Sequence, residues 1–372
     1  MEQQSRSAVA DRLFADETTL VQTLAREAQL SPAQRAEVER IARTLVANVR
    51  ANRRAQGSID SFMQQFSLSS EEGVVLMCLA ESLLRIPDAD TADKLIADKI
   101  GEKDWEAHLG QSDSLFVNAS AWGLMLTGRL VELGKSPGAR GLASLKKLVS
   151  RSGEPIIRTA MRQAMRIMGK QFVLGRTIKE ALETAEPLAK DGWRFSFDML
   201  GESAMTEPDA ERYQTSYMKA VEAVGASSKG ADVFAAPSVS VKLSALHPRY
   251  EEKTKARCLP TLYARILDLA VAAKKRNIGL TIDAEEAARL DISLELFGQL
   301  AAAPELQGWN GLGLAVQAYG RRAKPALEWL AALAQKTGRI LPVRLVKGAY
   351  WDTEIKRAQE FGLESFPVFT RK

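Results

Sequence analysis

The sequence predicts an α/β protein in which an all-helical N-terminal part is followed by a β/α barrel. Up to about residue 190, apolar residues recur at helical spacing between short polar loops. After that point, short apolar runs alternate five times with helical stretches. Polar residues follow each of the five runs, and barrel enzymes collect their functional groups from the ends of several strands in this way.

Composition excludes several classes of protein. The 372 residues are 46% hydrophobic and 26% charged, as in ordinary globular proteins and unlike collagen-like, disordered or disulfide-scaffold chains. The net charge of +5 is spread over the chain, whereas a nucleic-acid binder usually concentrates basic residues on one face. Only Cys78, Cys258, His108 and His247 are present of their types, so we expect neither a metal site nor a Cys/His nucleophile pair.

The N-terminal half begins with acidic residues and lacks the apolar core of a signal peptide. Its most apolar stretch, Gly73–Ile86, is too short to cross a bilayer, so we expect a cytoplasmic protein. Helices are predicted to open at Ser31, Ser69 and Ser152, where capping residues precede apolar residues at helical spacing. The third helix carries an arginine row that we interpret as a solvated face, because no aromatic residues interleave with it: Arg158, Arg162 and Arg166.

The second half alternates strands and helices. The predicted strands are Phe195–Met199, Val239–Leu243, Gly279–Ile282, Leu312–Val316 and Pro342–Val346. The predicted helices between them are Glu211–Val224, Leu262–Lys274, Leu290–Ala302 and Pro325–Ala334. This alternation indicates a parallel sheet. A dinucleotide-binding doubly wound sheet needs a Gly-x-Gly-x-x-Gly turn after its first strand, but Met199 is followed by a single glycine, Gly201, so the barrel is favoured.

Charged and polar side chains at the strand ends are the candidate functional residues. They are Asp198, Glu202, Lys242, Ser244, Asp283, Glu285, Glu286, Gln317, Arg344 and Lys347. Cations on both sides of a pocket suit an anionic small molecule. Two chemistries remain open: a lysine could form a Schiff base with a carbonyl substrate while Asp283 handles protons, or the cations could flank a flavin and an acidic substrate. The small pair Gly348-Ala349 favours the flavin, because it lets backbone amides approach a cofactor phosphate.

The fifth strand end also carries a specific motif. Arg344 and the string Leu345-Val-Lys-Gly-Ala-Tyr-Trp-Asp352 resemble the flavin-binding signature of the proline dehydrogenase domain of the proline utilization A family. The other four strand ends carry matching strings in the family's order. These are Arg194-Phe-Ser-Phe-Asp-Met-Leu-Gly-Glu202, Ser240-Val-Lys-Leu-Ser-Ala-Leu-His-Pro248, Thr281-Ile-Asp-Ala-Glu-Glu286 and Ala315-Val-Gln-Ala-Tyr319.

This resemblance implies oxidation of L-proline to pyrroline-5-carboxylate, the first step of proline catabolism to glutamate, with FAD as cofactor and a quinone as electron acceptor. By resemblance, Lys242 pairs with the proline carboxylate and Asp283 organises the charges of the pocket. Arg344 hydrogen-bonds near the flavin N5 atom. The other implied flavin contacts are Ala284, Gln317, Val346, Lys347, Gly348 and Ala349, and Leu345 and Tyr350 are implied substrate contacts.

The resemblance also implies an organisation into a helical dimerisation arm (1–50), a helical domain (51–190) and the proline dehydrogenase β/α barrel (191–372). We expect a homodimer or higher oligomer, peripheral contact with the inner face of the membrane, and no nucleic-acid partner. Residues 191–372 are fewer than the roughly 250 of a complete (β/α)8 barrel, so about five β/α units are expected. The family's remaining strands, its arginine-rich helix motif and its aldehyde dehydrogenase module are expected outside these residues. We therefore expect this polypeptide alone to bind flavin weakly and to oxidise little proline.

Two alternative functions stay open from the residues alone. One is a Schiff-base barrel aldolase acting through Lys242 or Lys347. The other is a helical dimerisation or DNA-associated module, which would show salt-dependent binding to duplex DNA.

Overall fold

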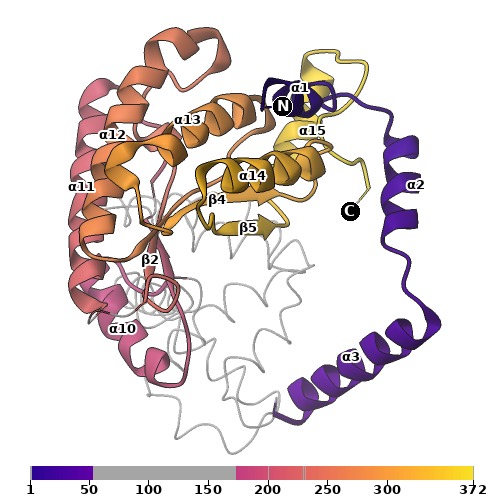
Figure 1. The fold of residues 1–372 in the computed structure, drawn as a ribbon, viewed down its shortest axis with the longest axis horizontal. Coiled ribbons are helices and arrows are strands. Elements are labelled where there is room, and N and C mark those ends of the chain that lie inside the picture. Colours follow the sequence, from indigo (N-terminus) through magenta and orange to yellow (C-terminus); the bar gives the residue numbers. More distant parts are fainter. Residues whose placement is uncertain (1, 53–172, 200, 229, 231, 372) are drawn as a thin grey trace, which may run out of the picture. The chain divides into compact units, whose positions relative to one another are not determined.

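The computed structural model describes residues 2–52, 173–199, 201–228, 230 and 232–371 (Figure 1). The chain divides into two compact units, of which the first combines residues 1–29 with 182–372 and the second comprises 30–181. The predicted helices that open at Ser69 and Ser152, the arginine row, Cys78 and His108 lie outside the described residues. Among the described helices, none is both long enough and apolar enough to cross a membrane.

The first unit is built on a sheet of five parallel strands, and this confirms the predicted α/β architecture. The strands are β1 (Ser196–Asp198), β2 (Ser238–Val241), β3 (Gly279–Ile282), β4 (Leu312–Gln317) and β5 (Val343–Val346). Each strand pairs with the next one along the chain, so the order in space is β1-β2-β3-β4-β5. A doubly wound sheet reverses its strand order at a switch point, whereas consecutive β/α units in chain order are the arrangement of a barrel.

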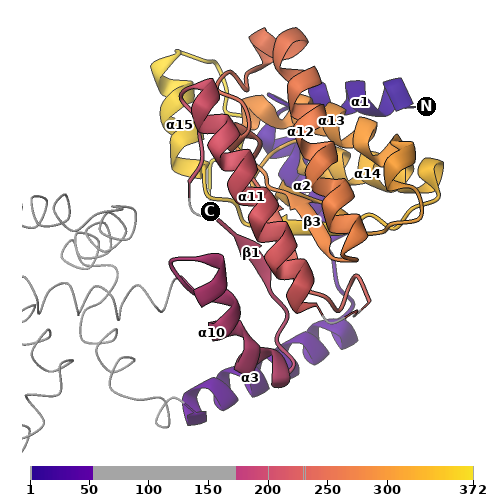
Figure 2. The same cartoon turned by 90° about the vertical axis from the view of Figure 1, so that its left-hand side faces the viewer.

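A helix follows each strand, and the helices that follow β1 to β4 pack on the outside of the sheet (Figures 1 and 2). These helices are α11 (Glu207–Ser227), α12 (Lys255–Lys275), α13 (Leu290–Ala302), α14 (Ala323–Thr337) and α15 (Trp351–Glu360). Single 3-10 turns lie in the connections at Leu243–Ala245, Glu252–Thr254, Ala287–Arg289 and Pro304–Leu306. The start of α11 shows why a helix begins there, because Thr206 and Asp209 form a reciprocal capping box.

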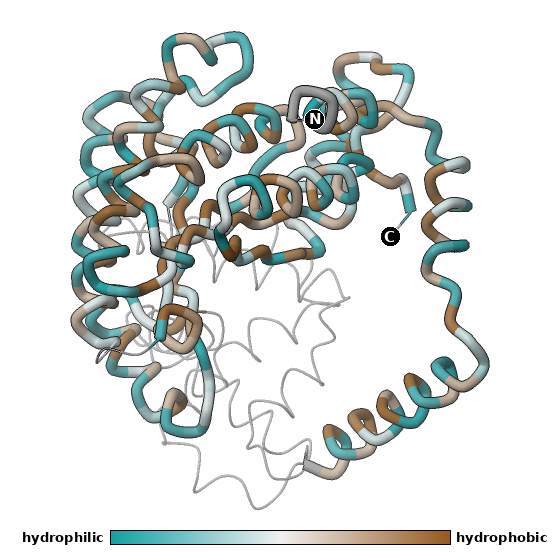
Figure 3. Tube along the Cα trace, viewed as in Figure 1, coloured by the Kyte–Doolittle hydropathy of each residue, from teal (hydrophilic) through white to brown (hydrophobic). Residues whose placement is uncertain are grey.

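Strand alternation separates an apolar face from a polar one. Val239 and Val241 on β2, like Leu280 and Ile282 on β3, are fully buried between the sheet and its helices. The alternate positions carry Ser240 and the residues of the candidate site. Figure 3 shows hydrophobic residues along the strands and the inner sides of the helices, and hydrophilic residues on their outer sides. The core therefore lies between sheet and helices, which leaves the concave face of the sheet for polar groups.

The N-terminal segment packs against the same unit. Its helices are α1 (Glu2–Ala10) and α2 (Glu17–Glu27), and Val9 of α1 is buried. The described part of the second unit includes α3 (Pro32–Asn52), which confirms the helix predicted to open at Ser31. A further helix, α10 (Ile178–Lys190), spans the boundary between the two units. The domain boundaries at residues 50 and 190 stay a prediction.

Candidate active site

Strand register brings three residues of the candidate site together. Val241 on β2 lies opposite Ile282 on β3, so Lys242 and Asp283, the next residues on these strands, are neighbours. On the other side, Ile282 lies opposite Leu314 and Ala315 lies opposite Arg344, which places the small Ala315 between Asp283 and Arg344. The side chains of Asp283 and Arg344 meet across it in an ion pair.

The result is a row of alternating charges along the concave face. The Lys242 ammonium donates to Asp198 at 2.8 Å and to Asp283 at 3.1 Å, and Arg344 donates to Asp283. The side chains of Lys242 and Asp283 are only 15% and 13% exposed, so water screens their interaction little. We call Asp198, Lys242, Asp283 and Arg344 the charge row.

The charge row keeps Lys242 protonated. Burial by itself lowers the pKa of Lys242, but the hydrogen bond to Asp198 and the charges of Asp283 and Asp198 outweigh it and raise the pKa above its ordinary value. A Schiff-base lysine needs a depressed pKa to be nucleophilic at neutral pH. The geometry therefore favours a binding role for Lys242 and disfavours the aldolase alternative.

Hydroxyl groups of neighbouring residues form hydrogen bonds with members of the charge row. The hydroxyls of Ser196 and Ser240 lie 3.0 Å apart, and Arg344 donates to Ser196 at 3.4 Å. The backbone amide of Lys242 donates to the hydroxyl of Tyr217 on α11 at 3.2 Å. The Nε atom of Arg344 is buried, and no acceptor within the described residues lies within hydrogen-bonding distance of it.

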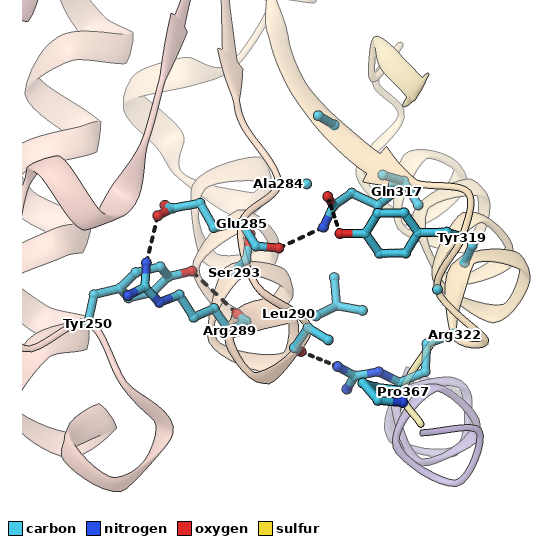
Figure 4. Close-up of a pocket in the computed structure, with 15 residues that line it drawn as sticks. Tyr250, Ala284, Glu285, Arg289, Leu290, Ser293, Gln317, Tyr319, Arg322 and Pro367 are labelled. Atoms are coloured by element: carbon cyan, nitrogen blue, oxygen red, sulfur yellow. Dashed lines mark hydrogen bonds and ion pairs between the residues drawn. The ribbon is translucent and has the colours of Figure 1, made fainter. Parts of the chain in front are cut away.

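A second group of residues surrounds Gln317 at the end of β4 (Figure 4). The Gln317 amide donates to the backbone oxygen of Glu285 at 2.7 Å and accepts from the Tyr319 hydroxyl at 2.6 Å, so its orientation is fixed from both ends. Gly348 has a φ of +96°, and a Cβ atom there would lie 2.2 Å from Cε1 of Tyr319. The tyrosine ring therefore needs a glycine at position 348. A small pocket, partly open to solvent, lies beside this group and is lined by Ala284, Glu285, Gln317 and Tyr319 among others.

Glu285 has a structural role that the sequence did not reveal. It is 7% exposed, and its carboxylate accepts from the backbone amide of Ser244 at 3.0 Å and from Arg289 at 2.7 Å. The Ser244 hydroxyl in turn accepts from the amide of Ser203, a non-glycine residue with φ +59°. Burial raises the pKa of Glu285, against the opposing effects of Ser244 and Arg289. Its polar character after β3 was visible in the sequence, but nothing there indicated that it joins three loops.

The remaining sequence-predicted residues differ in their exposure and in whether they lie near the charge row or Gln317. Leu345 is 58% exposed and lies on the face of β5 opposite Arg344, as strand alternation requires. Tyr350 lies near Glu202, with 3.5 Å between its hydroxyl and the carboxylate. Lys347 and Ala349 are exposed, and Val346 is half-buried beside Gln317. The structure thus brings together Lys242, Asp283 and Arg344 directly, groups Gln317 with Ala284 and Gly348, and does not bring Leu345 to either group.

Comparison with known proteins identifies the family to which this chain belongs. Residues 181–372 match the family model described as proline dehydrogenase. The chain belongs to the proline dehydrogenase family. Residues 3–50 match the model of the proline utilization A proline dehydrogenase N-terminal domain, and residues 58–172 match a model described as the DNA-binding domain of proline dehydrogenase.

Individual relatives agree with the family. The chain is 48% identical to the bifunctional protein PutA of Salmonella typhimurium and 47% identical to that of Escherichia coli, in each case over 99% of this chain and 28% of the relative. A crystal structure of a mutant of Bradyrhizobium japonicum proline utilization A matches with a TM-score of 0.67 and 46% identity, over 96% of this chain and 36% of that one. The chain thus spans 28% of the length of the two curated relatives and 36% of the crystallised chain.

The described residues also bear on metal binding. Within them, no three His, Cys, Asp or Glu side chains gather closely enough to hold a metal ion. The acidic side chains nearest the candidate site, Asp198 and Asp283, are instead engaged by Lys242 and Arg344.

Proposed function

We propose that the carboxyl end of the sheet binds FAD and L-proline and oxidises proline to pyrroline-5-carboxylate, and that a quinone then takes the electrons. The observation that carries this proposal is the ion-paired row of Lys242, Asp283 and Arg344 in a chain of the proline dehydrogenase family. Family membership supports the reaction, and the row supplies the cations that an acidic substrate and a reduced cofactor need.

The residues present fit a flavin. The buried Nε of Arg344 is a donor without an acceptor in the described part of the chain, as expected of a group that faces a ligand. Gly348 presents a backbone free of a side chain next to the fixed amide of Gln317. We propose Arg344, Gln317 and Gly348 as flavin contacts, with Ala284, Val346, Lys347 and Ala349 around them.

In this site each residue has a defined task. When bound, the flavin would supply the acceptor for the hydride that leaves C5 of proline, the ring carbon next to nitrogen that does not carry the carboxylate. Lys242, held protonated by its carboxylate partners, pairs with the substrate carboxylate. Asp283 holds Lys242 and Arg344 at a fixed separation and balances their charge in the absence of substrate. Arg344 places positive charge where negative charge develops during reduction of the cofactor. We assign Tyr350 to the substrate side of the mouth, opposite Glu202.

We also propose a location and partners for this protein. We propose a cytoplasmic homodimer or higher oligomer that touches the membrane peripherally to reach its quinone. The match of residues 58–172 to a model named for DNA binding favours one second candidate, a DNA-associated module. Duplex binding that weakens steeply with salt would support that candidate, whereas binding to no duplex at low salt would exclude it.

The proposal is tested by loading the protein with FAD and measuring oxidation of L-proline with a dye as electron acceptor. FAD titration followed by flavin fluorescence gives the affinity, and Arg344→Met should weaken it. Turnover of L-proline that exceeds turnover of D-proline supports the assignment. Trapping of a carbonyl substrate on Lys242 by borohydride, without any flavin requirement, would contradict it and restore the aldolase alternative.

A further inference from the structure

The segment that follows α15 crosses the loop that carries Tyr319. Residues 365–370 run antiparallel to this loop, with a bridge between Gly320 and Val368. The amide of Phe369 donates to the backbone oxygen of Tyr319 at 2.9 Å, and Val368 is fully buried. The position of Tyr319 therefore depends on residues 365–370, which we call the crossing segment.

Arg321 fastens the crossing segment to the N-terminal part of the chain. Its guanidinium donates to the hydroxyl of Ser365 at 2.9 Å, to the backbone oxygen of Ala15 at 2.6 Å and to the carboxylate of Glu17 at 2.9 Å. The Arg321 side chain is only 4% exposed. A charged group this buried needs its partners, because an unpaired charge in the interior is costly.

Glu17 hydrogen-bonds both to Arg321 and to the crossing segment. One carboxylate oxygen accepts from Arg321, and the other accepts from the backbone amide of Thr370 at 2.8 Å and from its hydroxyl at 3.1 Å. Glu17 is thus the one side chain in the described residues that bonds both Arg321 and the crossing segment. The carboxylate of Glu27, in the same helix α2, pairs instead with the exposed Lys324 at 2.5 Å. An exposed pair of this kind contributes little, so Glu27 provides a natural comparison.

Continuous contacts connect Glu17, Arg321 and the crossing segment to the proposed flavin site. The crossing segment holds the backbone of Tyr319, the Tyr319 hydroxyl holds the amide of Gln317, and the Tyr319 ring packs against Gly348. Loss of these contacts would therefore reach Gln317 without any direct contact between it and Glu17.

We propose that Glu17 is a positioning residue for the flavin site, which holds the Gln317–Tyr319 pair in place through Arg321 and the crossing segment. This inference rests on the proposed function only in that Gln317 contacts a flavin. The support of the Tyr319 loop by Glu17 is a property of the chain without cofactor.

The first experiment measures amide hydrogen exchange in the flavin-free chain for wild type, Glu17→Gln and the matched control Glu27→Gln. We expect Glu17→Gln to accelerate exchange at Arg321, Phe369 and Thr370 by about tenfold, the effect of losing one charge-assisted hydrogen bond. Glu27→Gln should leave these amides unchanged. Unchanged exchange in Glu17→Gln, or equal acceleration in both variants, overturns the proposal. If Glu17→Gln does not fold, Thr370→Pro, which removes both the amide and the hydroxyl that donate to Glu17, takes its place, and exchange is then read at Arg321 and Phe369.

The second experiment measures FAD affinity in a double-mutant cycle. Glu17→Gln should weaken FAD binding by about threefold to tenfold in the wild-type background and cause no further loss in a Gln317→Leu background, because both changes remove the same contact. Additive losses, or an unchanged affinity despite faster exchange, overturn the proposal. If wild type binds no FAD, the proposed function fails, and the exchange experiment alone decides whether Glu17 supports the Tyr319 loop.

Discussion

Replacing Asp283 with asparagine is the most informative single change in the charge row. Asp283 is the one carboxylate in the described structure that pairs with both Lys242 and Arg344. Asparagine has the same size and keeps an oxygen acceptor, but it removes the negative charge between two cations. The substitution therefore isolates electrostatics from packing.

The expected loss follows from burial. Removing one partner of a buried ion pair costs about 3–5 kcal/mol. Here Lys242 keeps Asp198, and the Arg344 side chain is 38% exposed and screened by water, so we expect a smaller loss of about 2–3 kcal/mol in the free energy of unfolding. For a unit of this size, about 2–4 °C in Tm corresponds to each kcal/mol, which gives a decrease of about 4–12 °C.

The assay is chemical and thermal denaturation followed by circular dichroism, with Asp268→Asn as the matched control. Asp268 is an exposed carboxylate on α12, and its loss should change stability by less than about 0.5 kcal/mol. If Asp283→Asn is as stable as this control, the charge row does not hold the two cations as described. A loss of FAD affinity should accompany the loss of stability, because Arg344 is no longer anchored.

Two further predictions concern the surroundings of the charge row. Gly348→Ala should lower the free energy of unfolding by about 2–4 kcal/mol and weaken FAD binding, because its Cβ would collide with Tyr319. The control Gly192→Ala has a similar φ of +94° but nothing within 4 Å of the added Cβ, so it should cost only about 1–2 kcal/mol. Thermal denaturation compares the two variants, and equal losses would refute the collision. Burial raises the folded-state pKa of Glu285 above its ordinary 4.5, so the folded state binds its proton more tightly and wild-type stability should fall as pH rises through that interval. Glu285→Gln should lack this contribution in urea denaturation between about pH 4 and pH 8, and a wild type that gains stability over the variant as pH rises would contradict the sign.

The sequence was informative where function depends on local pattern. Period-2 and period-3.6 hydrophobicity predicted the five strands and the helices between them, because burial of one face dictates that spacing. The placement of Lys242 and Asp283 at the ends of neighbouring strands predicted that they would be adjacent, since the carboxyl ends of parallel strands share one edge of the sheet.

Contacts between distant segments were beyond reach of the same reasoning. Glu17 and Arg321 are 304 positions apart, and neither stands out by type or spacing. The pairing of Lys242 with Asp198 depends on the stagger between strands, which the apolar pattern does not encode. At Leu345, the motif and the strand geometry disagree. The motif assigned this residue to the substrate, whereas the alternation of side chains along β5 turns it away from Arg344.

The central claim is that Lys242 recognises the carboxylate of proline beside a bound flavin. Its most direct test is anaerobic mixing of the FAD-loaded protein with L-proline while the flavin absorbance is followed, for wild type, Lys242→Met and the control Lys219→Met, an exposed lysine on α11. This measurement needs no quinone, and comparison between variants makes it independent of the absolute rate. We expect bleaching by L-proline in wild type and in Lys219→Met, with at least about tenfold weaker apparent affinity for proline in Lys242→Met, the loss expected for one charge-assisted contact. Equal affinity for L-proline in Lys242→Met and wild type would contradict it.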